Sequence, residues 1–442
     1  MSTAPSAREV ALLGLGVFRR GGAWSDGYFK KAAASLDVRE AALAARLFYG
    51  VLQNQALCDF YLDAFSTTPV RRMEDKVADC LRLGVYQLCF LDKIPQSAAV
   101  SESVSLARRY VKNPRAAGFV NAVLRGVARS ADRLPEVPKD DYVNYLSVRY
   151  SHPRWLTEEF LALFGPEETE ALLAADNAEA PMTIQRNPLR GSLAALEESL
   201  RSEGVETQPH PFLPDALNLR HTGDLESRAA FREGFFWVQD AAARMAVTAA
   251  GLRPGMRVLD ACAAPGGKSF AAAADLLGQG NILACDIHPH KLRLIENGAV
   301  RLGMTCIETR LMDAREPDER LLSSFDAVIA DVPCSGLGII RKKPDIRYKD
   351  PGPLPGLPRV QRAIIDRVSS CVKPGGVLIY STCTLLPREN GDVVRNFLAE
   401  HPDFAAEPFS LPVAEAERGE VTLLPHRHGT DGFYIAKLRR NV

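Results

Sequence analysis

The stretch that decides the fold is V-L-D-A-C-A-A-P-G-G-K-S, residues 258–269. It opens with apolar residues, continues through small side chains, and reaches Gly266 and Gly267 just before a helix predicted at Lys268–Leu277. Paired glycines at a strand-to-helix turn let a ligand approach the backbone and expose N–H groups at the start of the helix. The spacing matches neither G-x-G-x-x-G nor a Walker loop, which disfavours NAD and ATP as the ligand.

Short apolar strands and helices alternate on the carboxyl side of this turn. The predicted strands are Arg257–Ala261, Ile282–Asp286, Cys306–Leu311, Ala327–Asp331, Val377–Thr382 and Phe433–Leu438. The predicted helices are Lys268–Leu277, His290–Leu302, Arg359–Cys371 and Val393–Glu400. This alternation predicts a doubly wound, mostly parallel sheet, so we expect residues 235–442 to form a Rossmann-like α/β domain.

Two further domains are predicted ahead of the α/β domain. Residues 5–130 carry apolar residues at helical spacing and predict an all-α bundle. Residues 131–150 are polar and contain two prolines, which predicts a linker. Residues 150–228 read as a small α+β module. Its predicted helices are Trp155–Phe164, Glu168–Ala175 and Leu193–Leu200, and its predicted strands are Met182–Gln185 and Leu217–Leu219.

Composition places the chain in the globular class. Its 442 residues are 46% hydrophobic and 24% charged, and no apolar run is long enough to span a membrane. With no signal-peptide pattern at the start, we expect a cytoplasmic protein. The nine cysteines form no C-x-x-C pair, so we expect neither a disulfide framework nor a bound metal.

The net charge of zero conceals an uneven distribution along the chain. Residues 1–130 hold 18 Lys and Arg against 11 Asp and Glu, a net charge of +7, and the remainder holds 36 against 43, a net charge of −7. A basic module joined to an acidic one favours a polyanion-binding arm on a compact domain, although ordinary surface variation would give the same sum.

Acidic residues stand at or just after the ends of three predicted strands. Asp286 ends the second strand, where a carboxylate can accept both hydroxyl groups of a ribose. Asp313 follows the third strand and could accept a hydrogen bond from an adenine amino group, and Asp331 ends the fourth. A single acid in such a place more often caps a helix. Three acids beside one glycine turn favour a nucleoside ligand.

Two cysteines follow the fourth and fifth predicted strands, in D-V-P-C-S-G (331–336) and Y-S-T-C-T (380–384). Neighbouring strands lie about 4.8 Å apart, so Cys334 and Cys383 are expected to open onto one pocket. Carbon C5 of cytosine is a poor nucleophile until a group such as a thiolate adds to C6. One attacking and one assisting cysteine would suit methyl transfer from a sulfonium donor, whereas a lone cysteine would more often be a buried structural residue.

Together, D-A-C-A-A-P-G-G-K-S, D-V-P-C-S-G and Y-S-T-C-T resemble the RNA cytosine-C5 methyltransferase family that includes the bacterial Sun (Fmu, RsmB) and the eukaryotic NOP and NSUN enzymes. The resemblance implies that Cys383 is the nucleophile, that Cys334 assists product release, and that S-adenosyl-L-methionine is the cofactor. It further implies that a defined set of residues holds this cofactor: Cys262, Ala263, Ala264, Pro265, Gly266, Gly267, Lys268, Asp286, Asp313 and Asp331. Asp331 could face the cofactor, the cytosine or both.

The amino-terminal part also bears a resemblance. S-E-S-V-S-L-A (101–107) and G-F-V-N-A-V-L-R (118–125) resemble the NusB-like RNA-binding domain fused to the bacterial enzymes, and W-V-Q-D (237–240) and G-T-D-G-F-Y (429–434) match the same family. This implies 16S ribosomal RNA as the substrate, free or in an early subunit assembly, and a monomeric enzyme. The stretch Q-R-N-P (185–188) departs from the family's R-x-N-T, which puts that RNA contact in doubt.

A basic segment follows the first cysteine motif. The run I-R-K-K-P-D-I-R-Y-K (340–349) combines cations with one tyrosine, which favours phosphate contacts and stacking on an unpaired base over a plain solvated loop. Because a paired base is inaccessible, the target cytosine should be single-stranded or flipped. Two alternatives stay open: a transfer RNA cytosine-C5 methyltransferase, and a non-catalytic NusB-like RNA-binding factor.

Overall fold

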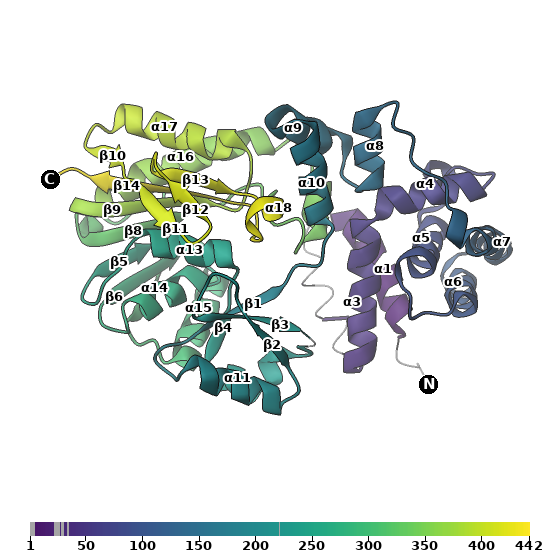
Figure 1. Cartoon of the computed structure of the whole chain (residues 1–442), viewed down its shortest axis with the longest axis horizontal. Helices are drawn as coiled ribbons and strands as arrows, with labels where there is room; N and C mark the ends of the chain where they lie inside the picture. The colour runs from purple at the N-terminus through teal and green to yellow at the C-terminus, as the bar shows by residue number, and fades with distance from the viewer. Residues whose placement is uncertain (1–4, 22–26, 28–30, 33–34, 221) are drawn as a thin grey trace. The chain divides into compact units, whose positions relative to one another are not determined.

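The computed structural model describes residues 5–21, 27, 31–32, 35–220 and 222–442 (Figure 1). The chain divides into two compact units. The first consists of residues 1–178 and 340–350, and the second of residues 179–339 and 351–442. Within the described ranges, no helix is long and apolar enough to cross a membrane.

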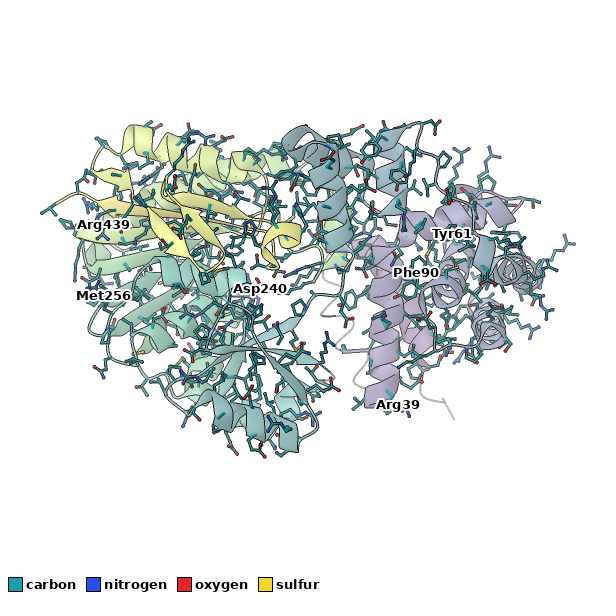
Figure 2. All side chains as sticks on the ribbon, viewed as in Figure 1. Arg39, Tyr61, Phe90, Asp240, Met256 and Arg439 are labelled. Atoms are coloured by element: carbon teal, nitrogen blue, oxygen red, sulfur yellow. The ribbon has the colours of Figure 1, made fainter. Side chains whose placement is uncertain are left out.

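The first unit begins with a helical bundle, which confirms the predicted all-α fold. Apolar residues at helical spacing, such as Leu47 and Leu81, are fully buried in one shared core, and Tyr61 and Phe90 pack against it (Figure 2). Asp37 begins the second described helix by accepting hydrogen bonds from two backbone amides. The helices are α1 (Ala7–Gly21), α3 (Val38–Gln53), α4 (Gln55–Phe65), α5 (Asp75–Phe90), α6 (Gln96–Tyr110) and α7 (Ala116–Arg129).

Residues 131–150 contain a helix, α8 (Tyr142–Arg149), so the linker prediction is wrong for much of this stretch. The helix is held by its aromatic residues. The hydroxyl groups of Tyr142, Tyr145 and Tyr150 all donate to the carboxylate of Glu170, at 3.0, 3.3 and 3.0 Å. Two more helices complete this run of the first unit, α9 (Arg154–Phe164) and α10 (Pro166–Asp176).

The chain returns to the first unit at residues 340–350, more than 160 residues after it has left that unit. A short 3-10 helix, Pro344–Tyr348, fixes this segment against α3, because the Tyr348 hydroxyl donates to the carbonyl of Leu52 at 2.6 Å. The Arg347 side chain is fully buried. Its guanidinium donates to four oxygen atoms: the carbonyls of Gln53 (3.1 Å), Tyr150 (3.2 Å) and Ser151 (3.2 Å), and Oδ1 of Asn177 (3.0 Å).

The second unit begins with a four-stranded antiparallel sheet of order β2-β3-β1-β4. The sequence predicts two of its strands, β1 (Met182–Arg186) and β3 (Ala216–Arg220), and its helix α11 (Leu193–Ser202). The short outer strands β2 (Glu206–Pro209) and β4 (Phe236–Val238) are not predicted. One further short helix, α12, spans Ala229–Arg232. The small α+β module is thereby confirmed.

The larger sheet has the order β10-β14-β9-β8-β5-β6-β7, with β13 paired to β14. The five strands from β9 to β7 are parallel, and β14 is antiparallel to β9. The chain runs outward from β5 in one direction and then crosses to β8 on the other side, so the strand order reverses between β5 and β8. The sheet strands are β5 (Arg257–Asp260), β6 (Asn281–Asp286), β7 (Ile307–Leu311), β8 (Phe325–Asp331), β9 (Val372–Thr382), β10 (Phe404–Ala406), β13 (Glu420–Leu423) and β14 (Phe433–Arg440).

Helices cover both faces of this sheet (Figure 1). Alternate strand residues point to opposite faces: Val258 packs with Phe270 of one set of helices, and Leu259 packs with Ile365 and Phe397 of another. Asp240, labelled in Figure 2, begins α13 by accepting from a backbone amide. The helices are α13 (Ala241–Ala249), α14 (Gly267–Asp275), α15 (Pro289–Leu302), α16 (Leu357–Val368), α17 (Gly391–Glu400) and α18 (Pro425–His428). A small hairpin joins β11 (Phe409–Leu411) to β12 (Ala414–Ala416).

Candidate active site

The glycine turn lies at the carboxyl end of β5, beside the point where the strand order reverses. Gly266 has φ +111°, and a Cβ atom there would collide with the ring of Phe270, so only glycine fits. The turn is tied to the next strand, because the amide of Ala263 donates to the carbonyl of Cys285 at 2.7 Å. The residues Cys262 to Lys268 therefore form one fixed loop that ends in the first turn of α14.

A buried acid in this turn was not singled out from the sequence. Asp260 is fully buried, and one of its carboxylate oxygens accepts from the Ser269 hydroxyl at 2.7 Å. The other oxygen, Oδ1, has no hydrogen-bond partner among the described residues. Burial raises the pKa of Asp260 to about 7, with the nearby carboxylates of Asp331 and Asp286 acting in the same direction. An acid at the end of an apolar strand was the only available signal.

The two predicted acids on the other side of the turn have different surroundings. Asp286 ends β6, is 8% exposed, and accepts from the amide of His288 at 2.9 Å. Asp313 follows β7, and its carboxylate binds the Arg315 side chain at 2.6 Å, which holds the pKa of Asp313 below its usual value. Asp286 thus lies in the turn region with Asp260, whereas Asp313 is engaged by a neighbouring cation.

Lys268 and Asp331 form a close ion pair between the glycine turn and the end of β8. The Lys268 Nζ atom lies 2.6 Å from Oδ2 of Asp331, and the Ser381 hydroxyl donates to Oδ1 of the same carboxylate at 2.8 Å. Burial opposes the charge on Lys268, but Asp331, Asp260 and Cys383 together hold its pKa above the usual value. The cation therefore stays charged beside Cys383.

The structure brings the two predicted cysteines together. Strands β8 and β9 are adjacent and parallel, with Asp331 paired to Ser381, so the loops that follow them lie side by side. The Cys334 and Cys383 sulfur atoms are 3.3 Å apart and both residues are free cysteines, each partly exposed. The hydrogen bond with Cys383 and burial raise the pKa of Cys334 well above its usual value. Cys334 is therefore favoured in its thiol form.

The loops that carry these cysteines are also joined through their backbones. The amide of Gly338 donates to the carbonyl of Cys383 at 2.9 Å, and the amide of Gly432 donates to the carbonyl of Gly338 at 2.8 Å. A Cβ atom on Gly338 would overlap the backbone of Gly432. The segment 429–434, which the sequence analysis also identified, therefore packs against the loop that carries Cys334.

The predicted RNA contact at residues 340–349 is wrong for two of its side chains. Arg347 and Tyr348, expected to bind phosphate and stack on a base, are instead packed into the helical unit, where their side chains bind backbone carbonyls. Asn187, in the stretch 185–188, is fully buried and donates to the carbonyls of Gly234 and Leu302, each at 2.8 Å. These side chains complete the fold and are not available to RNA.

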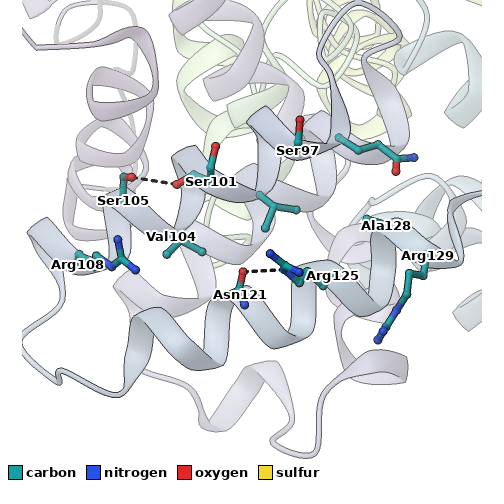
Figure 3. Close-up of a pocket in the computed structure, with 11 residues that line it drawn as sticks. Ser97, Ser101, Val104, Ser105, Arg108, Asn121, Arg125, Ala128 and Arg129 are labelled. Atoms are coloured by element: carbon teal, nitrogen blue, oxygen red, sulfur yellow. Dashed lines mark hydrogen bonds between the residues drawn. The ribbon is translucent and has the colours of Figure 1, made fainter.

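A basic groove lies between α6 and α7 of the helical unit (Figure 3). Its volume is about 590 Å³. Serine side chains of α6 line one wall of the groove, together with the exposed Arg108. The exposed Arg125 and Arg129 line the wall formed by α7. Within the described residues, none of these three arginines forms an ion pair, and Arg125 donates only to Asn121 at 3.1 Å. We call this feature the α6–α7 groove; it is lined by Gln96, Ser97, Val100, Ser101, Val104, Ser105, Arg108, Asn121, Arg125, Ala128 and Arg129.

The site residues fit a nucleoside donor that carries positive charge. Asp260, Asp286 and Asp331 surround a turn of small residues, and Oδ1 of Asp260 is a buried acceptor that still lacks a donor. Anionic side chains attract a cationic ligand, and the glycine turn admits it to the backbone. Within the described part of the chain, no group of three or more His, Cys, Asp or Glu side chains is arranged to hold a metal ion.

Comparison with known proteins agrees with this architecture. Family models match three segments: the NusB family (residues 6–129), the ferredoxin-like domain of RsmF/B-like methyltransferases (152–226) and 16S rRNA methyltransferase RsmB/F (247–439). The "probable ribosomal RNA small subunit methyltransferase B" of Bacillus subtilis is 35% identical, over 98% of this chain and 99% of its own length. A methyltransferase homologue from Pyrococcus horikoshii has a solved structure that is 25% identical, covers 68% of this chain and 99% of its own, and gives a TM-score of 0.59.

Fold and site together define a Rossmann-like methyltransferase with an added NusB-like helical domain and a ferredoxin-like module. Such enzymes take their methyl group from a cofactor of the S-adenosylmethionine type. The chain belongs to the family of the bacterial ribosomal RNA small subunit methyltransferase B proteins.

Proposed function

We propose that this enzyme methylates C5 of a cytosine in 16S ribosomal RNA, with S-adenosyl-L-methionine as the methyl donor and Cys383 as the nucleophile. The observation that carries the proposal is the pair of free sulfur atoms, 3.3 Å apart, at the carboxyl ends of adjacent parallel strands. The Lys268–Asp331 ion pair lies beside them, at the glycine turn. In this arrangement one cysteine can add to the pyrimidine ring, and the other can assist release of the methylated base.

Cys383 is assigned the attack because it lies beside the charged Lys268, whereas the hydrogen bond with Cys383 and burial raise the pKa of Cys334. A thiolate is the reactive form of cysteine, and a raised pKa makes Cys334 the poorer source of one. Attack joins the Cys383 sulfur to C6 and moves the C5–C6 double-bond electrons towards C5. When bound, S-adenosylmethionine supplies a methyl group from a positively charged sulfur.

Product release breaks the bond between the Cys383 sulfur and C6. Loss of the C5 proton restores the C5–C6 double bond, and the C6–sulfur bond breaks with its electron pair returning to Cys383. Cys334, whose sulfur lies within hydrogen-bonding distance of the leaving sulfur, assists this step. Asp331 lies beside the pocket with one oxygen bound to Lys268 and the other to Ser381, where it orients the lysine towards the cysteines.

The residues proposed to hold the cofactor are the loop Cys262 to Lys268 together with Asp286, Asp313 and Asp331. Asp286 is the acid for the ribose hydroxyls, because it ends the strand next to the turn. Asp313 reaches an adenine amino group only if its pairing with Arg315 opens. Asp260 is added to this set as a buried anion that favours a cationic ligand.

The α6–α7 groove is proposed as a contact for the RNA backbone. Its arginines are exposed and carry no carboxylate partner among the described residues, so their guanidinium groups can donate to phosphate oxygens. Within the basic segment 340–349, Arg347 and Tyr348 are no longer proposed as RNA contacts, because they pack into the helical unit. The target cytosine reaches the cysteines only when it is unpaired or flipped out of its helix.

Ribosomal RNA is favoured over transfer RNA because curated relatives that align along nearly the whole chain are named for the small ribosomal subunit. The test uses the full-length protein with cofactor labelled in its methyl group. It compares unmodified 16S RNA, early subunit assemblies and unmodified transfer RNA. We expect 5-methylcytosine in one position of 16S RNA. Methylation of transfer RNA alone would overturn the substrate assignment, and no transfer to either RNA would favour a binding factor.

A further inference from the structure

Two adjacent buried residues, Glu389 and Asn390, each contact one of the two cysteine loops. They lie between β9 and α17 in the chain, and neither is proposed to react with the substrate. Both side chains are buried, with exposures of 0% and 2%. Buried polar side chains that are hydrogen-bonded to neighbouring loops hold those loops in one position.

Glu389 holds the loop of Cys334 on both sides of the cysteine. Its Oε2 atom accepts from the amide of Ser335 at 2.9 Å and from the side-chain amide of Gln361 at 2.8 Å. The same Gln361 nitrogen donates to the carbonyl of Pro333 at 3.1 Å. The residues immediately before and after Cys334 are therefore both tied to a single carboxylate oxygen, one directly and one through Gln361.

Asn390 holds the loop of Cys383 in the same manner. The Thr382 hydroxyl donates to Oδ1 of Asn390 at 2.5 Å, and the Asn390 side-chain nitrogen donates to the carbonyl of Thr384 at 3.0 Å. These are the residues immediately before and after Cys383. One further bond joins the two loops directly, since the hydroxyls of Ser335 and Thr384 lie 2.7 Å apart.

We infer that Glu389 and Asn390 are positioning residues that set the separation of the Cys334 and Cys383 sulfur atoms. This inference rests on the proposed roles of the two cysteines. Because the two residues are consecutive, a movement of one cysteine loop is transmitted to the other through one peptide bond. The Glu389–Asn390 dipeptide thus positions both sulfur atoms through hydrogen bonds to the residues beside each cysteine.

The carboxylate of Glu389 also separates the roles of two otherwise similar thiols. The groups that raise the pKa of Cys334 are Cys383, Glu389 and Asp331, together with burial. Oε1 of Glu389 has no hydrogen-bond partner among the described residues. A carboxylate that raises the pKa of Cys334 makes this thiol a weaker acid.

The test separates hydrogen bonding from charge with two variants of the same residue. Glu389→Gln keeps an oxygen that accepts from Ser335 and Gln361 but removes the charge, whereas Glu389→Ala removes both. Glu296→Gln is the matched control: it lies in the same unit on α15, and its carboxylate accepts from the Thr309 hydroxyl of the edge strand β7 at 2.6 Å. Each full-length protein is assayed for kcat, KM and the fraction trapped as a denaturant-resistant RNA adduct.

We expect Glu389→Ala to lower kcat by about 100-fold with KM within twofold, since loss of positioning at the reacting atoms costs rates of this order. The adduct fraction should rise, because release depends on Cys334. In Glu389→Gln, kcat near neutral pH should stay within about tenfold, and the alkaline limb of the activity profile should move to lower pH. Glu296→Gln should match the parent protein in every readout.

A second measurement needs no substrate. Alkylation of Cys334 is followed by mass spectrometry across pH in the Cys383→Ser background, with and without Glu389→Gln. The carboxylate raises the pKa of Cys334, so its removal should move Cys334 alkylation to lower pH. An unchanged alkylation profile, or a folded Glu389→Ala enzyme with parental kcat and adduct level, overturns the inference while leaving the proposed function intact. A methylating Cys383→Ala enzyme would instead overturn the proposed function.

Discussion

The sulfur atoms of Cys334 and Cys383 lie 3.3 Å apart although 49 residues separate them in the chain. That distance is well beyond the roughly 2.05 Å of a disulfide bond and within reach of a hydrogen bond between sulfurs. Two thiolates this close repel each other, so the pair gives up one proton more readily than two. The raised pKa of Cys334 favours its thiol form, so we expect the two cysteines to have different roles and their variants to have different defects.

Cys383→Ala should reduce methyl transfer by at least about a thousandfold, because the attacking sulfur is gone and Cys334 holds its proton. Labelled-methyl incorporation into unmodified 16S RNA measures the loss. Cofactor binding by calorimetry serves as the control for folding. Turnover within tenfold of the parent enzyme would falsify the assignment of the nucleophile.

Cys334→Ala should leave attack intact and slow release. A protein–RNA adduct that survives denaturing electrophoresis should accumulate, and multiple-turnover rates should fall more than the rate of the first turnover. The double variant with Cys383→Ala is the control and should form no adduct. Fast turnover without any adduct in the single variant would show that Cys334 has no part in release.

Asp260→Asn should make the cofactor-free protein more stable above neutral pH. In the folded state the pKa of Asp260 is about 7, above its unfolded value of 3.8, so the folded protein binds the extra proton between these values. The free energy of unfolding should therefore fall as pH rises from about 4 to 7, by a few kcal/mol at most. Urea unfolding at several pH values tests this, and an equal slope in the variant and the parent would refute it.

Charge reversal in the α6–α7 groove should weaken RNA binding. The variant Arg125→Glu with Arg129→Glu removes two exposed cations, so the slope of log Kd against log salt should decrease by about 1.5. The control is Arg39→Glu, an equally exposed arginine on α3, which should keep the parental slope. Equal salt dependence in all three proteins would show that the groove does not contact phosphate.

Arg347→Ala should destabilise the helical unit by about 3–5 kcal/mol, because the carbonyls of Gln53 and Ser151 lose their buried donor, whereas that of Tyr150 keeps a hydrogen bond from Asn177. Chemical denaturation followed by circular dichroism measures the loss. Arg71→Ala, an exposed substitution in the same unit, should change stability by no more than about 0.5 kcal/mol. If Arg347→Ala behaved like Arg71→Ala, the buried guanidinium would not stabilise the unit.

Local pattern was enough to predict the sheet and the meeting of the two cysteines. Cys334 and Cys383 each follow a short apolar strand, and adjacent parallel strands bring such ends to one edge. Glu389 and Gln361 could not be found in this way, because their role depends on how irregular loops fold against each other. From the sequence a glutamate in a turn is expected to be exposed until its partners, Ser335 and Gln361, are known.

The basic segment 340–349 shows the opposite limit of sequence reasoning. Cations and a tyrosine in a loop are typical of RNA contacts, and nothing local reveals that Arg347 has partners about 170 to 290 residues earlier in the chain. Long-range burial of an arginine requires several acceptors that only the folded chain supplies. The helix at Tyr142–Arg149 lies in the predicted linker for the same reason. Its Tyr142 hydroxyl donates to Glu170, which lies in another helix and is not recognisable as a partner from the local sequence.

The late return of the chain to its first unit has a consequence for synthesis on the ribosome. The helices up to Ala178 emerge early, but the guanidinium that satisfies their buried carbonyls belongs to Arg347. At translation rates of about 5–20 residues per second, the nascent bundle waits on the order of ten to thirty seconds for that segment. Until then its carbonyl groups must be hydrated or shielded by chaperones, so the amino-terminal helices mature only after most of the second unit has been made.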